Sequence, residues 1–448
     1  MKFWGSDKKE YETLGEPKSG GEGDVYCVAG MPEKVIKILH KEKRTEIRKK
    51  KLEYMIANPP SGYARSHVAW PEVILFSNGI FSGYVMPKVS SNMSLSAACN
   101  FVGDSYEEGF SYRSKIRIAG AITKIMKDLH EAGYVIGDFN PKNITINPQN
   151  GEVRFVDADS YHIVINKAEN EAFRCAVAAD GYWAPELLRK AESYLAVNDV
   201  KDVLLRLPLD TFTKETDYFC LAIHIFSLLM NGFTPFCGIG LTETASTGNP
   251  GVGNKAILAG NYCFATGKKP QAAAILQRSE LPGAIVALFD RAFIDGFDNP
   301  SKRPNPDEWL AALHMFFDNL KNCRQDARHQ GYAKLNYCPL CAATKRFNRV
   351  MEVTKVTEER KPVAPVAPPP PPPLPQGLST TRKEGTLRKI LKKVWKVIRL
   401  VSLSIFYLLW VIFEAIFKFL FGAGWIVGII LLASAIVGLV LKFVFHLF

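Results

Sequence analysis

The pattern of apolar and polar positions predicts strands near the N-terminus, helices through the middle of the chain and an apolar tail. Residues 34–39, Lys-Val-Ile-Lys-Ile-Leu, read as a strand, whereas residues 41–55 are strongly helical and basic. Apolar side chains recur at helical spacing over residues 118–129. A longer apolar helix opens at Asp217 and ends near Met230.

The tail is apolar enough to enter a membrane. Residues 400–413 are almost wholly apolar, and after Glu414 and Lys418 the apolar run continues from 419 to 441, a length of 23 residues that can span the hydrocarbon core. Two topologies are open. Either 419–441 crosses alone while 400–417 lies in the interface, or both segments cross as a helical hairpin.

A basic segment directly precedes this tail. Residues 382–399 hold eight Lys or Arg residues and one Glu, so they supply +7 of the formal net charge of +12. This favours anionic membrane lipids as partners, and no nucleic-acid partner is expected. Both topologies keep the basic segment and the preceding chain on the cytoplasmic side of an inner or plasma membrane. Gly424 and Gly428 form a G-x-x-x-G that allows self-association through the membrane helix.

The densest chemistry lies between residues 135 and 159. Asp138 and Asn143 are five residues apart, and Asp157 follows them after a short predicted hairpin. The first Asp can orient or deprotonate a hydroxyl, while the Asn and the second Asp can hold magnesium on the phosphates of ATP. These are the parts that phosphoryl transfer requires.

Two motifs upstream suit the same chemistry. Gly20, Gly21, Gly23 and Val25 lie in a turn whose glycines let the backbone approach phosphate closely, with a plain hairpin turn as the alternative. Twelve residues after Val25 comes Lys37, which can contact phosphates, with a solvated edge lysine as the alternative.

The order of these motifs resembles that of the protein kinase family, in particular the eukaryotic-like kinases of bacteria. Residues 184–186, Ala-Pro-Glu, match the motif that closes the activation segment. Asp217 matches the residue that braces the catalytic loop backbone, and Arg303 matches the arginine that pairs with Glu186. We therefore expect a buried Glu186–Arg303 ion pair.

The resemblance implies an α+β fold with two lobes, followed by a membrane-inserted part. The expected parts are a small β-rich N-lobe at 10–90, a helical C-lobe at 91–320, a zinc knuckle at 321–348, a Pro-rich linker at 349–381, the basic juxtamembrane segment at 382–399 and a transmembrane helix or helical hairpin within 400–448.

The resemblance also implies ATP and Mg²⁺ or Mn²⁺ as cofactors and assigns roles to the residues. Asp138 would act as the base, with Asn143 and Asp157 on the metal, and the glycine turn with Val25 would cover the phosphates. Lys37 would be fixed by a helix carboxylate. Glu53 fits this role better than Glu42 or Glu46, because Leu52, Met55 and Ile56 form an apolar face beside it. A surface i,i+4 pair is the alternative for Glu53.

Several residues depart from the family pattern. Gly137 replaces the arginine before Asp138, which makes control by phosphorylation of the activation loop less expected. Asn140 stands where a lysine usually contacts the γ-phosphate, and Lys142 could serve instead. Ala158 and Asp159 replace the Phe and Gly that usually follow the metal-binding Asp.

These features predict a membrane-anchored kinase that phosphorylates protein Ser or Thr hydroxyls, although the placement of Lys142 keeps Tyr open. A membrane-tethered pseudokinase scaffold that binds ATP is the main alternative. A small-molecule kinase is weaker, because the Ala-Pro-Glu motif and Arg303 are features of protein kinases.

Two further motifs follow the kinase-like region. Cys338 and Cys341 form a C-x-x-C, and Cys323 and His329 could complete a four-ligand zinc site, with a redox pair or unligated thiols as alternatives. The linker contains six consecutive prolines at 368–373, which favour a stiff spacer or a ligand for a partner that binds Pro-rich motifs.

Overall fold

The computed structural model describes residues 1–90, 93–99, 110–195, 200–244, 249, 251–273 and 275–359. The expected linker beyond residue 359, the basic segment 382–399 and the apolar tail 400–448 lie outside the described residues. Among the helices that are described, none has both the length and the apolar character that a membrane crossing needs.

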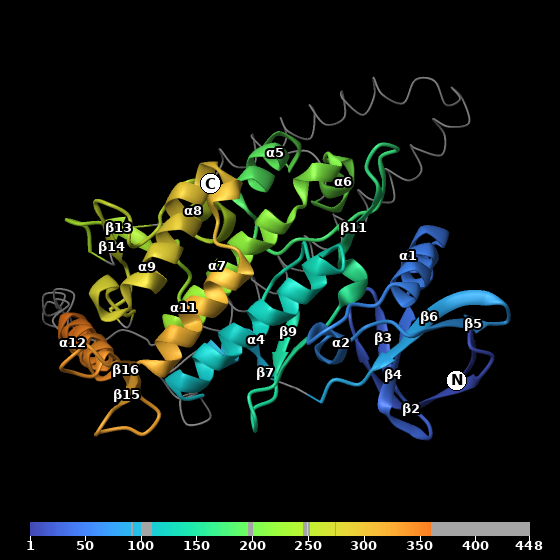
Figure 1. Ribbon diagram of the computed structural model, residues 1–448, viewed down its shortest axis with the longest axis horizontal. Coiled ribbons are helices and arrows are strands. Elements are labelled where there is room, and N and C mark those ends of the chain that lie inside the picture. The colour runs from blue at the N-terminus through green and yellow to red at the C-terminus, as the bar shows by residue number, and fades with distance from the viewer. Residues whose placement is uncertain are drawn as a thin grey trace, which may run out of the picture. The chain divides into compact units, whose positions relative to one another are not determined.

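The first part of the chain forms a closed β-barrel with one helix against it (Figure 1). The strands follow the order β1-β2-β3-β4-β6-β5, with bounds β1 Lys2–Gly5, β2 Glu10–Ser19, β3 Gly23–Val28, β4 Met31–Leu39, β5 Val73–Ser77 and β6 Ile80–Pro87. Helix α1, Glu46–Ala57, contacts β5. The predicted strand 34–39 lies within β4. Strand β1 begins before residue 10 and contributes the buried Phe3 to the barrel interior.

The second part is mainly helical. Its long helices are α4 Tyr112–Glu131, α5 Pro185–Leu195, α7 Lys214–Leu229, α9 Gly283–Asp290, α11 Pro306–Asp318 and α12 Pro339–Glu359. The shorter helices are α3 Leu95–Cys99, α6 Val200–Arg206, α8 Gly253–Leu258 and α10 Gly296–Asp298. Helix α2, Ala64–His67, lies between α1 and β5 in the chain and contacts α4. The small sheets contain β7 Met93–Ser94, β8 Tyr134–Val135, β9 Ile144–Ile146, β10 Val153–Phe155, β11 His162–Asn166, β12 Glu171–Phe173, β13 Gly238–Gly240, β14 Lys268–Pro270, β15 Leu320–Asn322 and β16 Gln330–Tyr332.

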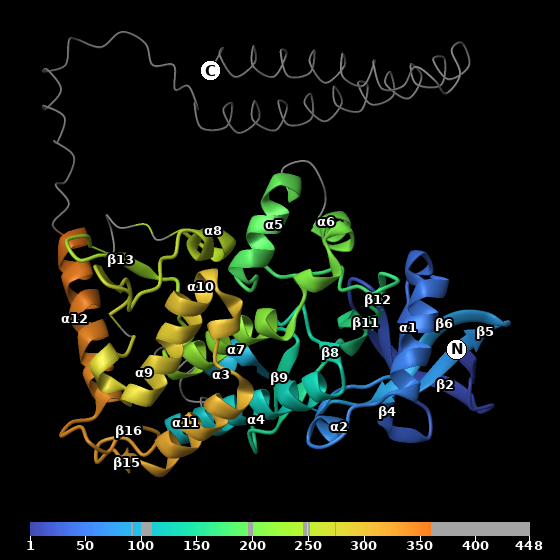
Figure 2. The ribbon, with the colours of Figure 1, turned by 45° about the horizontal axis from the view of Figure 1, so that its top comes forward.

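Helices α4 and α7 pack together at the centre of this second part (Figure 2). Helix α4 begins after Ser111, whose side chain accepts a hydrogen bond from the amide of Ser114 and so caps the helix. The predicted apolar face over 118–129 is confirmed, because its apolar side chains are buried. Helix α7 is buried on nearly all sides, as expected for a helix with apolar residues around its whole circumference.

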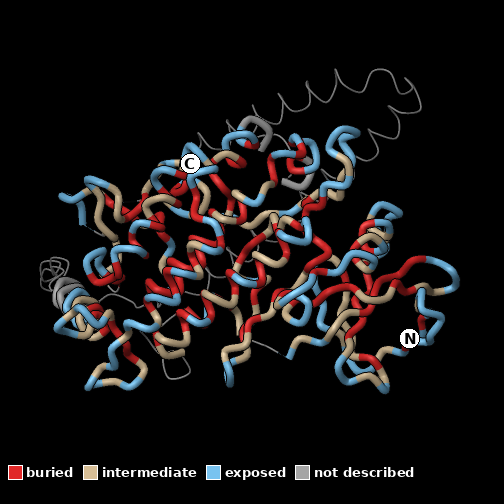
Figure 3. The backbone as a smooth tube through the Cα atoms, viewed as in Figure 1, coloured by how far each residue is buried: buried red, intermediate tan, exposed pale blue. Residues whose placement is uncertain are grey.

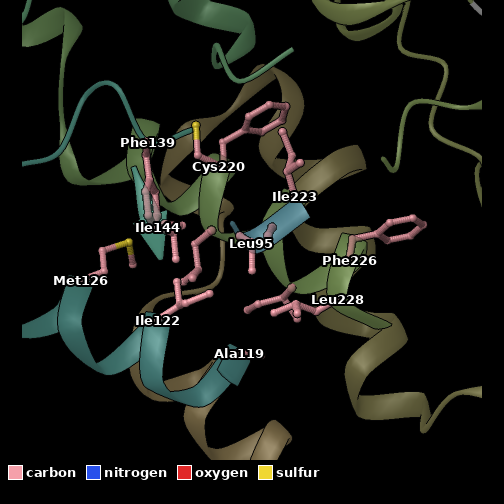
Figure 4. Close-up of a cluster of buried hydrophobic side chains, with 14 of the residues drawn as sticks. Leu95, Ala119, Ile122, Met126, Phe139, Ile144, Cys220, Ile223, Phe226 and Leu228 are labelled. Carbon is pink, nitrogen blue, oxygen red and sulfur yellow. The ribbon is translucent and has the colours of Figure 1, made fainter. Parts of the chain in front are cut away.

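The core around the loop that carries Asp138 is formed by several elements (Figure 4). Its labelled side chains are Leu95 of α3, Ala119, Ile122 and Met126 of α4, Phe139 before β9, Ile144 of β9, and Cys220, Ile223, Phe226 and Leu228 of α7. Figure 3 shows buried residues running through both parts while outer turns are exposed. The β-rich first part and the helical second part match the predicted α+β division.

Candidate active site

The backbone around Asp138 is held by a buried carboxylate from α7. Asp217 accepts hydrogen bonds from the amides of Ile136, at 2.7 Å, and Gly137, at 3.0 Å. The Nε2 of His130, at the end of α4, lies 2.8 Å from the same carboxylate. The predicted contact between Asp217 and the catalytic loop is therefore present. His130 acts here as a partner of Asp217 rather than as a reacting group.

A second α7 residue supports the loop and was missed from the sequence. The Nε2 of His224 donates to the carbonyl oxygen of Phe139 at 2.9 Å, directly beyond Asp138. Because His224 follows Asp217 by seven residues, both side chains lie on the same face of the helix. This seven-residue spacing could have indicated from the sequence that His224 faces the same loop as Asp217. Burial lowers the pKa of His224 to about 4, so its ring is neutral near pH 7.

Gly137 is required by the local backbone. Its φ is +73°, a left-handed conformation that favours glycine. A Cβ at this position would lie 2.9 Å from the Sγ of Cys175. An arginine would be strained in this conformation, and its Cβ would meet Cys175, so glycine suits this position.

The carboxylate of Asp138 is oriented by two donors. Its Oδ2 accepts from the Nδ2 of Asn143 at 3.2 Å, and its Oδ1 accepts from the amide of Ala179 at 3.1 Å. Asn143 also donates to the backbone oxygen of Asp138 at 3.0 Å. Asp138 is half-buried, so its oxygens are fixed without being fully removed from solvent. The structure brings together the predicted base and the predicted asparagine.

The hairpin formed by β9 and β10 places Asp157 close to Asn143. Residue Phe155 pairs with Ile144, and the amide of Val156 donates to the carbonyl oxygen of Asn143 at 2.9 Å. Two residues after β10, Asp157 adopts a left-handed conformation with φ of +61°. The predicted metal ligands therefore lie at the same end of this hairpin.

Lys37 reaches across from β4 to this end. Its Nζ lies 2.6 Å from Oδ1 of Asp157 and 2.9 Å from Oδ1 of Asp159. Burial opposes the charge of Lys37, but the nearby carboxylates of Asp159 and Asp157 outweigh it and raise the pKa of Lys37 well above its ordinary value. The ammonium therefore stays charged in a buried position.

The expected pairing of Lys37 with Glu53 is not formed. Glu53 is exposed on α1, and its carboxylate lies 3.7 Å from the Nζ of Lys49, four residues earlier. The reason is the orientation of α1, whose buried face consists of Lys51, Leu52 and Met55. Glu53 follows Lys51 by two residues and therefore points to another side of the helix. The other glutamates considered, Glu42 and Glu46, are exposed as well.

Helix α1 presents cations to the site instead of a carboxylate. The Nη2 of Arg48 lies 2.8 Å from Oδ2 of Asp159 and also contacts the carboxylate of Glu22. Burial opposes ionisation of Asp159, yet the charges of Lys37 and Arg48 hold the pKa of its carboxyl well below the ordinary value. Lys51 is buried beside them, and burial lowers its pKa to about 8. Asp159 was read from the sequence only as a lost glycine, so its role was missed.

The glycine turn connects β2 and β3. A Cβ on Gly21 would meet no atom within 4 Å, whereas one on Gly23 would lie 2.2 Å from the carbonyl oxygen of Ile38. Gly23 is thus needed for close strand packing, whereas Gly21 is open and a Cβ on Gly20 would lie 3.4 Å from the carbonyl oxygen of Gly23. Val25 lies opposite Lys37 in the β3–β4 register.

Two other predicted residues have opposite surroundings, since Lys142 is exposed and Arg303 is buried. Lys142 is exposed, and its amide donates to Oδ1 of the buried Asn140 at 2.9 Å. By contrast, Arg303 and Glu186 form the expected ion pair, in which two guanidinium nitrogens each lie 2.7 Å from one carboxylate oxygen. Arg303 is buried and also donates to the carbonyl oxygen of Glu215 at 2.8 Å.

The four predicted zinc ligands come together elsewhere in the helical part. The ligand atoms of Cys323, His329, Cys338 and Cys341 all lie within 4.8 Å of one another. A second group of possible metal ligands consists of Glu22, Asp157 and Asp159 beside Lys37. One carboxylate oxygen from each also lies within 4.8 Å of the others. Carboxylate oxygens of this kind are the ligands that Mg²⁺ prefers.

Comparison with known proteins finds similarity to kinases, in agreement with the motifs. Protein kinase YegI of Escherichia coli (strain K12) is 29% identical to the chain over 345 residues, which covers 74% of this chain and 49% of the relative. Protein kinase YegI of Escherichia coli O157:H7 is 29% identical over 334 residues, covering 72% and 47%. The chain thus spans about half the length of the curated relatives it matches. No family model matches the chain. The similarity supports a divergent kinase of bacterial type.

Proposed function

We propose that the chain is a protein kinase that transfers the γ-phosphate of ATP to Ser or Thr hydroxyls of proteins. The observation that carries this proposal is the oriented carboxylate of Asp138, which accepts hydrogen bonds from Asn143 and Ala179. The contact of Lys37 with Asp157 adds a phosphate-binding cation beside the predicted metal ligand. Protein as the substrate, and Ser or Thr as the acceptor, rest on the family resemblance.

Each residue has a role in this reaction. Asp138 accepts the proton of the substrate hydroxyl, and the donors to its two oxygens fix the orientation of the carboxylate for that transfer. Asp157 and Asn143 would hold Mg²⁺, which when bound neutralises charge on the phosphates. Lys37 would exchange a carboxylate partner for phosphate oxygens. The open position at Gly21 leaves room for the backbone of the turn to approach the phosphates.

A scaffold that binds ATP without transferring phosphate is the second candidate. It is favoured by one observation, the engagement of Lys37 by two carboxylates of the chain itself. Such a protein would bind the nucleotide and recruit partners without using Asp138 as a base.

The test uses the full chain with labelled ATP and Mg²⁺ or Mn²⁺. We expect phosphate transfer to the chain itself or to a generic protein substrate, abolished in Asp138→Asn and Asp157→Asn. Glu53→Gln is the matched control, since Glu53 lies exposed beside Lys49 and should leave transfer unchanged. Nucleotide-dependent thermal stabilisation without transfer would favour the scaffold. Transfer that persists in both Asp variants would overturn the assigned roles.

We also propose that the chain is anchored to a membrane with its catalytic part on the cytoplasmic side. The support is the sequence alone, in which basic residues 382–399 precede the apolar run 419–441. Sedimentation of the full chain with membranes, resistant to high salt and alkaline washing, is expected. A chain shortened after residue 381 should stay in the supernatant, and sedimentation of both forms alike would contradict the proposal.

A further inference from the structure

Three cysteines and a histidine come together where the hairpin β15–β16 meets the start of α12. Cys323 directly follows β15 and His329 directly precedes β16, and the amide of Cys323 donates to the carbonyl oxygen of His329 at 3.0 Å. Cys338 directly precedes α12, and Cys341 lies in its first turn. Figures 1 and 2 show β15, β16 and α12 at the end of the helical part that is far from the barrel.

The distances among these ligand atoms suit a tetrahedral metal. The Sγ of Cys323 lies 3.6 Å from that of Cys341, and the Nδ1 of His329 lies 3.3 Å from Sγ of Cys341 and 3.9 Å from Sγ of Cys338. Zinc bonds of about 2.3 Å to sulfur and about 2.05 Å to nitrogen give tetrahedron edges of roughly 3.5 to 3.8 Å. These three distances are close to such edges, and all four ligand atoms lie within 4.8 Å of one another.

Backbone amides donate to two of the sulfurs, and a carboxylate lies near the imidazole. The amide of Gln325 donates to the Sγ of Cys323 at 3.3 Å, and the amide of Cys341 donates to the Sγ of Cys338 at 3.5 Å. On the other side of the histidine ring, Nε2 lies 3.8 Å from Oδ2 of Asp326. A carboxylate beside the second ring nitrogen is a frequent feature of zinc-binding histidines.

We propose that Cys323, His329, Cys338 and Cys341 bind one structural zinc ion. Three thiolates and one imidazole complete a four-coordinate site made only of protein ligands, which is the arrangement of a structural rather than a catalytic zinc. Binding releases the thiol protons to solvent and involves no change of oxidation state. A redox pair would need only two sulfurs and gives no reason for the imidazole nitrogen to face them.

The ion would join the hairpin to α12 on the surface of the helical part. Helix α12 is attached to that part by Arg346, whose guanidinium pairs with both oxygens of the buried Glu280, at 3.0 and 2.9 Å. The hairpin contacts the start of α4, because the amide of Tyr112 donates to the carbonyl oxygen of Arg328 at 3.0 Å. Zinc would thereby close a connection between α12 and the start of α4.

The test measures metal in the full chain, purified in detergent without added metal. We expect about one zinc per chain, as one four-ligand site requires. Replacement by Co²⁺ should give the absorption bands of tetrahedral cobalt with sulfur-to-metal charge transfer. Cys338→Ser should lose both signals, while Cys237→Ser, at a cysteine outside the cluster, should keep them. Neither measurement depends on kinase activity.

A second variant covers the case in which Cys338→Ser fails to fold. His329→Cys should still bind one Co²⁺, with a spectrum shifted by the fourth sulfur. Removal of zinc from the unaltered chain by a strong chelator should lower its melting temperature reversibly. Substoichiometric zinc together with no cobalt spectrum would overturn the proposal. A disulfide between cluster cysteines in the freshly isolated chain, found by mass spectrometry, would overturn it as well.

Discussion

The Oδ1 of Asp159 lies 2.9 Å from the Nζ of Lys37, although 122 residues separate them in the sequence. Asp159 also accepts the guanidinium of Arg48 at 2.8 Å. In protein kinases the corresponding lysine pairs with a glutamate of the neighbouring helix. Here the carboxylate comes from the loop after β10, and helix α1 supplies cations.

Asp159→Asn should therefore weaken the proposed phosphate transfer even though Asp157, the proposed metal ligand, is intact. Loss of this carboxylate leaves Lys37 and Arg48 less well positioned, and we expect kcat/KM for ATP to fall about 100-fold. Steady-state kinetics with varied ATP measure the change. Glu53→Gln is the control and should keep the original value. An unchanged kcat/KM in Asp159→Asn would rule out a positioning role.

A carboxylate moved to α1 should restore part of this loss. Lys51 lies on the buried face of α1, close enough to Asp159 for the two charges to interact. We expect the double variant Lys51→Glu with Asp159→Asn to recover kcat/KM relative to Asp159→Asn alone. Lys51→Gln with Asp159→Asn is the matched control. Equal activity of the two double variants would show that Lys37 does not require a carboxylate from this side.

His224 should make stability depend on pH. Its pKa is lowered by burial to about 4, from an ordinary value near 6.5, so the unfolded chain binds its proton first as the pH falls. Stability is thus lost between about pH 6.5 and pH 4, by roughly 3 kcal/mol for this group alone. Chemical denaturation at several pH values measures the slope. His224→Gln keeps a donor for Phe139 and should flatten the curve in this window.

The remaining acid sensitivity of His224→Gln should come partly from His162. Burial also lowers the pKa of His162 to about 4, so it contributes with the same sign. A curve for His224→Gln that is as steep as that of the unaltered chain would contradict the assignment.

Breaking the Glu186–Arg303 pair should be costly. Arg303→Met leaves the carboxylate of Glu186 without its two charge-assisted hydrogen bonds, and we expect a loss of about 3 to 5 kcal/mol in unfolding free energy. Asp298→Asn breaks the exposed Arg189–Asp298 pair and serves as the control, with a loss below about 1 kcal/mol. Denaturant titration compares the two. Similar small losses would mean that the buried pair adds little.

Gly137→Ala should destabilise the catalytic loop more than Gly133→Ala does. Both glycines have positive φ, at +73° and +86°, but a Cβ on Gly133 would meet no atom within 4 Å. A Cβ on Gly137 would meet Cys175 at 2.9 Å. We expect about 1 kcal/mol for Gly133→Ala from the backbone alone, and about 1 to 2 kcal/mol more for Gly137→Ala. Equal losses in thermal unfolding would exclude the steric contribution.

The sequence predicted those parts of the site whose residues have fixed spacing along the chain. Asp138 and Asn143 are joined by a short loop, and Asp157 follows a single hairpin, so local chain geometry brings them together. The contact of Asp217 with the loop and the Glu186–Arg303 pair were available from the family resemblance alone. Both involve buried charges whose partners are strongly constrained.

The choice of Glu53 could not be made correctly from the sequence, because it depends on how α1 is rotated against the barrel. An apolar face formed by Leu52 and Met55 was recognised, but the charged Lys51 also belongs to that face. Burial lowers the pKa of Lys51, and among the groups that oppose this shift is Asp159, which comes from a loop far away in the sequence. Single-sequence patterns carry no information about such a compensating charge from a distant loop.

The placement of cations on α1 and of carboxylates on the loop after β10 also affects how an anion would enter the site. Three basic side chains, Lys37, Arg48 and Lys51, stand against the three carboxylates of Glu22, Asp157 and Asp159. Since these charges nearly cancel, they exert little long-range attraction on a distant polyphosphate. A polyphosphate would then be bound only at contact distance, where it replaces carboxylates as the partner of Lys37 and Arg48. The rate of this binding would respond weakly to ionic strength, in contrast to a site with unneutralised cations.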